Sequence, residues 1–254
     1  MNILFLGDVV ARTGRTAVIR RLNGLKQENQ ISFTVINGEN SAHGKGITSS
    51  IYHELINAGA DVITLGNHAF SKSEILLKLT ECPWLVRPAN LLPDAGNSYV
   101  IRECQGKRIA VVNVLGSVFM ENAAGESYPA MEKLLKEIRA DMILVDLHAE
   151  ATGEKELFWH LFRDRVTAVI GTHTHVQTAD ERVEHGCAYI SDAGMCGPFD
   201  SILGRDSSEL IARRYGNITR YTPASSPAVI SGVIIEIDDS TNRAVGIRRI
   251  QERP

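Results

Sequence analysis

Short apolar runs alternate with amphipathic stretches along the first part of the chain. Residues 2–6 (NILFL), 33–36 (FTVI) and 61–65 (DVITL) have the apolar character of buried strands. The stretches between them, TAVIRRLNGLKQEN and ITSSIYHELINAG, repeat apolar side chains at helical spacing. This order of strand, helix, strand, helix and strand predicts parallel strands covered by helices.

In the next part of the chain the regular alternation of strand and helix patterns is interrupted. Ser71-Lys72-Ser73-Glu74 has the pattern of a capping box and predicts a helix start. YVIREC and RIAVVNVL, joined by Gln105-Gly106-Lys107, predict a hairpin. Pro129 suits the first turn of a helix that continues through AMEKLLKEIRA.

The alternation then returns and continues to the C-terminus. We expect a strand at 142–147, a helix over EKELFWHLFRD and a strand at 166–171. ERVEHGCAYI predicts a hairpin around His185-Gly186, and VISGVIIEID with AVGIRRI predicts a final strand pair. Mixed sheets flanked by helices follow from this order. Because no repeat or linker interrupts it, we expect residues 1–254 to form a single domain.

Composition narrows the class of protein. The 254 residues are 44% hydrophobic and 22% charged, as in ordinary soluble proteins, and the net charge of −3 provides no overall basic surface for nucleic acid. Four widely spaced cysteines without a CxxC pair favour a reduced, cytoplasmic protein. MNILFLGDVV lacks a basic leader and predicts a first strand rather than a signal peptide. No run approaches the roughly 20 apolar residues of a membrane span, so we expect no membrane association.

Polar side chains that can bind metal or titrate follow five of the expected strands. In chain order they are Asp8, Glu39 with Asn40, Asn67 with His68, His148 with Glu150, and His173 with His175. In open α/β sheets the carboxyl ends of the strands form the ligand crevice. The sequence therefore predicts one shared site at this edge.

The side chains at that edge favour a metal centre. Carboxylates, imidazoles and amides without thiolates suit Mn, Fe or Zn ions better than a soft ion. Seven candidate ligands are too many for one tetrahedral ion but suit two ions that share a carboxylate. They are Asp8, Glu39, Asn40, Asn67, His148, His173 and His175. Glu39 is the expected bridge. Alternation along an extended segment would point His173 and His175 to the same side, with Thr174 facing away.

Each motif also has a simpler interpretation. Gly7-Asp8 and Asn37-Gly38-Glu39-Asn40 each fit a turn, and the histidine pair fits hydrogen-bonded core residues. His43, in the loop SAHGKG, fits either a surface position or one near substrate, and Arg213-Arg214 fits a solvated face. GMCGPFDSILG (194–204) predicts an ordered loop near the site. Only the combination of motifs is specific.

In this order GDVV, NGEN, LGNH, DLHAE and GTHTH resemble the motifs of the calcineurin-like metallophosphoesterase superfamily, and within it the YmdB family of bacterial phosphodiesterases. The resemblance covers nearly the whole chain and implies an α/β/β/α sandwich of two mixed sheets flanked by helices. Val10, Glu39 and Ala69 stand where the wider superfamily usually has His, Asp and Asp, which is typical of the YmdB branch. Ala11 and Gly153 depart from that branch, where Gly and Ser are common.

The resemblance also implies the chemistry. One ion would be held by Asp8, Glu39 and His175 with Asn40 nearby, and the other by Glu39, Asn67, His148 and His173. The ions would be divalent or trivalent transition metals, Fe or Mn first and Zn as the alternative. A hydroxide between them would attack phosphorus in line with the leaving oxygen, and His68 would protonate that oxygen or stabilise phosphoryl charge. Glu150 would accept a hydrogen bond from a ligand imidazole or a bound water.

The substrate implied by the resemblance is a small phosphodiester, with 2′,3′-cyclic nucleotides favoured and RNA ends as a further candidate. No motif assigns substrate-binding residues, and we expect a homo-oligomer. Two other functions stay open. The first is another metallohydrolase such as an amidohydrolase, although there the His-x-His pair normally follows the first strand. The second is a metal-binding regulatory protein with little phosphodiesterase activity.

Overall fold

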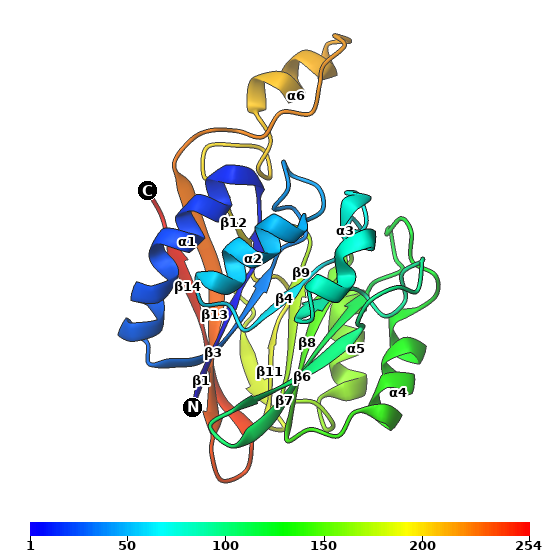
Figure 1. The fold of residues 1–254 in the computed structure, drawn as a ribbon, viewed down its shortest axis with the longest axis vertical. Helices are drawn as coiled ribbons and strands as arrows, with labels where there is room; N and C mark the ends of the chain where they lie inside the picture. Colours follow the sequence, from blue (N-terminus) through cyan, green and yellow to red (C-terminus); the bar gives the residue numbers. More distant parts are fainter.

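Two β-sheets face each other at the centre of the molecule and helices cover their outer faces (Figure 1). The protein is described over residues 1–254 by a computed structural model. The first half of the chain forms β1 (Asn2–Leu6), β2 (Asp8–Val9), α1 (Ala11–Glu28), β3 (Ile31–Asn37), α2 (Ser49–Asn57), β4 (Val62–Thr64), α3 (Glu74–Lys78), a 3₁₀ turn (Leu79–Glu81), β5 (Leu85–Val86), β6 (Tyr99–Cys104) and β7 (Lys107–Leu115). The second half forms α4 (Ser127–Glu137), β8 (Met142–His148), α5 (Thr152–Phe162), β9 (Ala168–Thr172), β10 (Arg182–Glu184), β11 (Cys187–Ile190), β12 (Met195–Pro198), α6 (Ser207–Arg214), β13 (Ala228–Asp238) and β14 (Arg243–Glu252).

Both sheets are mixed. The first has the order β2-β12-β13-β1-β3-β4-β5 with β14 beside β13, and its strands β1, β3, β4 and β5 are parallel. The second has the order β10-β11-β9-β8-β7-β6, with parallel pairs from β11 to β7 and an antiparallel strand at each edge. These parallel strands run with their carboxyl ends at one edge of each sheet, where ligand crevices form.

Alternation along the strands divides the apolar side chains between three cores. On β1, Leu4 and Leu6 pack under α1 and α2, whereas Ile3 and Phe5 pack between the two sheets. On β7, Ile109 joins the same core between the sheets, and Ala110 after it packs under α4 and α5. The sequence of a strand buried on both faces is a continuous apolar run, so these strands can be predicted from the sequence. The predicted α/β/β/α sandwich is confirmed.

The structure corrects two local predictions. Helix α3 begins at Glu74, and Ser73 before it makes no capping hydrogen bond through its side chain. Glu74 instead accepts a hydrogen bond from the hydroxyl of Ser49 at 2.7 Å, so the expected capping box is wrong. The segment 194–204 is also not wholly a loop, because β12 occupies its first half and pairs with β2 and β13.

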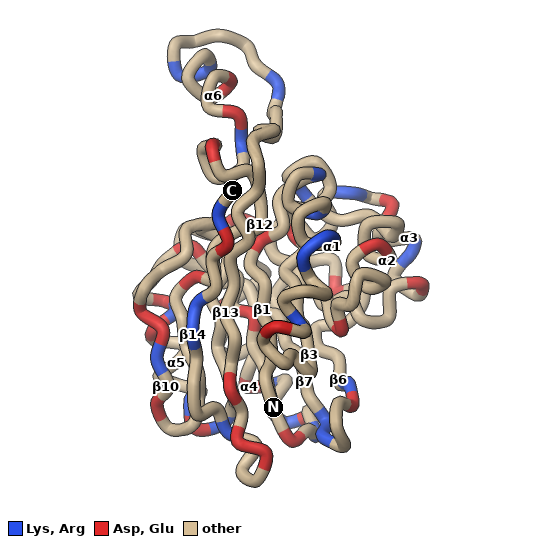
Figure 2. Tube along the Cα trace, turned by 90° about the vertical axis from the view of Figure 1, so that its left-hand side faces the viewer, with Lys and Arg blue, Asp and Glu red and all other residues tan.

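An arm over residues 199–223 projects from the sandwich and carries α6 (Figures 1 and 2). Its base is closed by hydrogen bonds from Asp206 N to the carbonyl of Thr222 at 2.9 Å and from Ala224 N to that of Gly204 at 3.0 Å. Asp206 caps α6, which contains no buried residue. The helix therefore packs little against the sandwich.

No helix has both the length and the apolar character needed to cross a membrane. All four cysteines are free thiols.

Candidate metal centre

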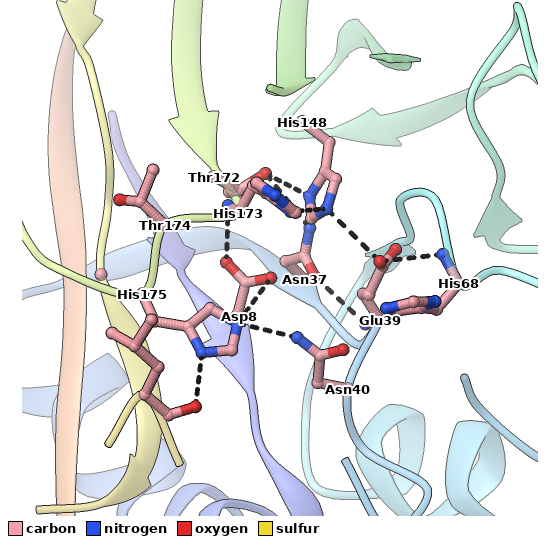
Figure 3. Close-up of polar contacts among 12 residues, drawn as sticks. Asp8, Asn37, Glu39, Asn40, His68, His148, Thr172, His173, Thr174 and His175 are labelled. Atoms are coloured by element: carbon pink, nitrogen blue, oxygen red, sulfur yellow. Dashed lines mark hydrogen bonds and ion pairs between the residues drawn. The ribbon is translucent and has the colours of Figure 1, made fainter. Parts of the chain in front are cut away.

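The polar residues that follow five strands converge where the two sheets meet. Asp8, Glu39 and Asn67 follow β1, β3 and β4 of the first sheet. His148 ends β8 and His173 follows β9 of the second sheet. Figure 3 shows most of these side chains facing one another across the gap between the two strand edges. The arrangement divides into two neighbouring groups.

The first group surrounds Asp8. Nε2 of His175 lies 3.7 Å from Oδ1 of Asp8 and 2.8 Å from the amide nitrogen of Asn40. Nδ1 of His175 donates a hydrogen bond to the carbonyl of Leu203 at 3.0 Å. Because that bond places a proton on Nδ1, the neutral ring has its lone pair on Nε2, which accepts a hydrogen bond from the Asn40 amide. A histidine that binds a metal through Nε2 has the same tautomer.

The second group surrounds His148. Its Nε2 lies 3.3 Å from Oε1 of Glu39, 3.1 Å from Oδ1 of Asn67 and 3.0 Å from Nδ1 of His173. Glu150, which is half-exposed, lies 3.2 Å from the other ring nitrogen of His173. One carboxylate, one amide oxygen and two imidazoles therefore meet within a few ångströms of each other.

A hydrogen-bond chain that the sequence did not reveal orients His148. Its Nδ1 lies 2.9 Å from the hydroxyl of Thr172, and that hydroxyl donates to Oδ1 of Asp146 at 2.7 Å. Asp146 is fully buried and also accepts from Thr64 and Asn37. Burial raises the pKa of Asp146 to about 6 against these hydrogen bonds and the charge of His148. Asp146 stands in DLHAE two positions before His148, but only the fold shows which way it faces.

Two buried carboxylate oxygens in the site have no hydrogen-bond partner. They are Oδ1 of Asp8 and Oε2 of Glu39. The two residues are 0% and 1% exposed to solvent. Burial of an unpaired carboxylate costs several kcal/mol unless a cation or a donor offsets its charge. The unpaired oxygens therefore fit a site that binds cations.

Burial and neighbouring charges also shift the pKa values of the imidazoles. Burial opposes the charged form of His148, but the charge and hydrogen bond of Glu39 and the charge of Asp8 raise its pKa to about 9. Burial, together with the charge of His148, lowers the pKa of His173 to about 3. One proton on His148 thus offsets part of the carboxylate charge. No three His, Cys, Asp or Glu side chains surround a single point that an ion could occupy.

Gly66 provides the space in which Glu39 and His148 meet. A Cβ atom on Gly66 would lie 2.1 Å from Oε2 of Glu39 and 2.4 Å from Nε2 of His148. Both distances are far inside van der Waals contact, so no larger residue fits without displacing the two side chains. The glycine of LGNH is explained by this close approach.

The backbone around the histidine pair differs from the extended segment that the sequence suggested. Strand β9 ends at Thr172, and His173 and His175 have φ values of 103° and 67°. A positive φ is unfavourable for residues with a side chain and persists where the surroundings impose it. This turn, rather than strand alternation, sends His173 toward His148 and His175 toward Asp8. Thr174 faces away, as expected, and bonds to Asp192 at 2.9 Å.

The candidate metal centre opens into a hollow of about 270 Å³. Its lining includes His68, whose backbone N–H donates to Glu39 at 2.9 Å. Burial lowers the pKa of His68, with Glu39 acting in the opposite direction and Lys45 in the same direction. Lys45 and Tyr221 also line this hollow, although no motif had singled them out.

Comparison with known proteins gives consistent results. A model of the family described as YmdB-like protein matches residues 4–250. The 2′,3′-cyclic-nucleotide 2′-phosphodiesterase of Bacillus subtilis strain 168 is 46% identical, over 98% of this chain and 96% of that protein. A crystal structure of a phosphatase from Mycoplasma pneumoniae superposes with a TM-score of 0.93 at 33% identity, covering 99% of this chain and 93% of that one.

A more distant structure shares the fold alone. The 5′-nucleotidase precursor of Thermus thermophilus has a TM-score of 0.56 at 13% identity, covering 99% of this chain and 54% of that chain. The sandwich is therefore also found in a larger protein with very different residues.

Proposed function

Because the chain belongs to the YmdB-like protein family, we propose that it is a metal-dependent phosphodiesterase that hydrolyses 2′,3′-cyclic nucleotides. The observation that carries this proposal is the pair of buried carboxylates at the strand-end edge, each beside an imidazole and each with one oxygen that has no hydrogen-bond partner. The Bacillus subtilis relative is named for the same reaction, and its similarity extends along nearly the whole chain. The metallophosphoesterase fold implies divalent metal ions.

The two groups of side chains suggest how two ions would be held. We propose that Asp8, Glu39 and His175 hold one ion with Asn40 nearby. Glu39, Asn67, His148 and His173 would hold the other. The distances among Asp8, Asn40 and His175 support the first group, and those from His148 to its three neighbours support the second. The share of Glu39 in the first ion rests on the family resemblance. Oxygen and imidazole nitrogen donors suit Fe or Mn, with Zn as the alternative. Two such ions would offset the charge of a bound phosphodiester and activate water for attack.

His68 is proposed as the residue that assists the leaving group. Its ring lines the same hollow as Glu39, Asn40 and the histidine pair. The hydrogen bond from its backbone to Glu39 keeps it beside the metal centre without using the ring. The ring can therefore approach substrate, where it would protonate the departing oxygen or donate a hydrogen bond to a phosphoryl oxygen.

Glu150 is proposed to orient His173. Its carboxylate lies 3.2 Å from Nε2 of that histidine, which leaves Nδ1 directed toward His148 and the proposed metal position. A carboxylate in this position makes the imidazole a stronger ligand.

The test is hydrolysis by protein loaded with Mn²⁺. Uridine 2′,3′-cyclic phosphate and bis-p-nitrophenyl phosphate should both be cleaved by the wild type and cleaved far more slowly by His68→Ala. His53→Ala, which changes an exposed histidine on α2, should behave as the wild type. Wild-type activity no higher than that of His68→Ala would contradict the proposal. Retention of metal without turnover would favour the regulatory protein, and turnover of amides alone would favour another metallohydrolase.

A further inference from the structure

A second hollow, of about 350 Å³, adjoins the one at the metal centre and is lined mainly by basic side chains. Its lining consists of His43, Lys45, Lys72, Arg205, Arg213 and Tyr221. We call it the basic hollow. It shares Lys45 and Tyr221 with the hollow at the metal centre. A ligand could therefore occupy both hollows without leaving the protein surface between them.

Three separate segments build the basic hollow. Lys45 comes from the Gly-rich loop after β3, and Lys72 from the segment before α3. Arg205 and Arg213 come from the projecting arm, which Figure 2 shows with several basic positions. The arm thus brings positive charge to the edge of the site from far along the chain. This accounts for a hollow that no local sequence motif indicates.

The arm residue Arg205 already has partners within the protein. Its guanidinium forms an ion pair with Glu209 at 2.6 Å and lies 4.7 Å from the ring centroid of Tyr221. These contacts offset its charge and fix its position beside the shared wall of the two hollows. Arg205 therefore forms part of the wall of the basic hollow, while Glu209 offsets its charge.

The other long basic side chains have no such partners. Lys45, Lys72 and Arg213 form no ion pair and donate no side-chain hydrogen bond within the protein, and Lys45 lies 6.0 Å from the ring centroid of Tyr221. Three unpaired cations around one hollow repel one another, and an anion bound between them would remove that repulsion. With a net charge of −3 on the whole chain, this local excess of positive charge is not a general property of the surface.

We propose that the basic hollow binds a second phosphate group, so that the preferred ligand is an oligoribonucleotide whose terminal 2′,3′-cyclic phosphate lies at the metal centre. The phosphodiester before that end would lie between Lys45, Lys72 and Arg213. This inference rests on the proposed function. A cyclic mononucleotide carries one phosphate, which the metal centre already accommodates, and it would leave Lys72 and Arg213 without an anion. A second phosphate supplies that anion.

Binding measurements test the inference without requiring turnover. The probes are uridine 3′-monophosphate and the dinucleotide UpUp, which carries one internal and one terminal phosphate, bound to Mn²⁺-loaded protein in calorimetry. We expect the wild type to bind UpUp about tenfold more tightly than the mononucleotide, and the preference to fall with added salt because phosphate contacts release counterions. Lys72→Gln with Arg213→Gln should abolish the preference and leave mononucleotide binding unchanged.

The matched control removes the same amount of charge from exposed positions of the arm. Arg214→Gln with Arg220→Gln changes two exposed arginines of the arm that do not line the basic hollow, and it should keep the preference for UpUp. Equal binding of both probes by the wild type, or an equal loss in the control, would overturn the inference.

The cyclic forms of both probes, assayed for hydrolysis in parallel, separate this inference from the proposed function. Absence of turnover with an intact preference for UpUp would contradict the proposed function alone. Turnover of the cyclic mononucleotide without any preference for the dinucleotide would contradict the basic hollow alone.

Discussion

The ammonium nitrogen of Lys155 lies 3.1 Å from a carboxylate oxygen of Asp192, and both side chains are almost completely buried. The same oxygen of Asp192 accepts hydrogen bonds from the backbone and the hydroxyl of Thr174, both at 2.9 Å. Lys155 also donates to the carbonyl of Thr172 at 2.9 Å. The pair therefore ties α5 to the turn that carries the two histidines of the proposed metal centre.

Replacement of Lys155 should destabilise the whole protein. Lys155→Met keeps most of the side-chain volume but leaves the buried charge of Asp192 without its partner. The expected loss is about 3–5 kcal/mol in the free energy of unfolding, the range typical of a broken buried ion pair. Urea unfolding of the metal-free protein measures it.

A double-mutant cycle provides the control. Asp192→Asn removes the charge while keeping the shape, so adding it to Lys155→Met should recover part of the lost stability. If the two losses simply add, the ion pair contributes no coupling and this account of the turn is wrong.

The close approach at Gly66 predicts a sharp loss of function from one methyl group. Gly66→Ala would place a carbon 2.1 Å from Glu39 and 2.4 Å from His148, so one or both side chains must move. Metal content and phosphodiesterase activity should both fall at least tenfold, since even small misplacement of catalytic groups costs on the order of 10²-fold in rate. Inductively coupled plasma mass spectrometry and steady-state assays measure the two effects.

Gly153→Ala is the matched control for that substitution. Gly153 lies in the first turns of α5, and a Cβ there meets nothing within 4 Å. The change should leave activity intact and stabilise the helix by about 0.4–1 kcal/mol, because alanine loses less conformational freedom on folding. Equal losses of metal and activity in Gly66→Ala and Gly153→Ala would contradict the steric explanation given for Gly66.

Much of the fold could be predicted because the strands are buried on both faces. Runs such as those of β3 and β8 stand out as apolar, and the polar residue at the end of each is visible without any structure. The hairpins expected around Gln105-Gly106 and His185-Gly186 also form, and all four of these residues have the positive φ values that such tight turns require.

The interactions between distant segments could not be predicted. Lys155 lies in a helical pattern where a lysine usually faces solvent, and no residue near it in the sequence indicates that it contacts Asp192. Helix α6 has no buried side chain, so no apolar stripe marked it. Arg213 is exposed, as expected for a solvated face, but only the folded chain brings it to the same hollow as Lys45 and Lys72.

The proposed bridge between the two ions gives a third prediction. Glu39→Gln removes the charge of a buried carboxylate that is 1% exposed, and bound metal should fall from two ions per chain to one or none. His68→Ala should keep both ions and lower chiefly kcat, because its ring is not among the proposed ligands. Metal analysis of the purified proteins decides between these outcomes.

Glu137→Gln controls for the loss of a carboxylate. Glu137 is exposed at the end of α4 and contacts no residue of the site. Its metal content should match the wild type. Equal metal loss in Glu39→Gln and His68→Ala would overturn the separate roles proposed for the two residues.

The acid limb of the stability curve should depend on Asp180. Its carboxylate accepts hydrogen bonds from the backbone N–H of Ser191 at 3.2 and 3.3 Å and from the hydroxyl of the same residue. Burial opposes ionisation, but the hydrogen bonds from Ser191 and Thr178 hold the pKa of Asp180 below its ordinary value of 3.8. Since the pKa is lower in the folded state, ionised Asp180 stabilises the protein above that ordinary value, and the stabilisation is lost as pH falls through the folded pKa.

Asp180→Asn should therefore be less stable than the wild type at pH 5–7, and the difference should shrink as pH falls below the ordinary value of 3.8. Urea unfolding of metal-free protein between pH 3 and 7 measures this, because removal of metal by chelation excludes loss of ions as the cause. Asp200→Asn, at an exposed position whose side chain makes no hydrogen bond, should follow the wild type throughout. A constant difference between Asp180→Asn and the wild type across this range would show that the carboxylate contributes through its shape and not through its charge.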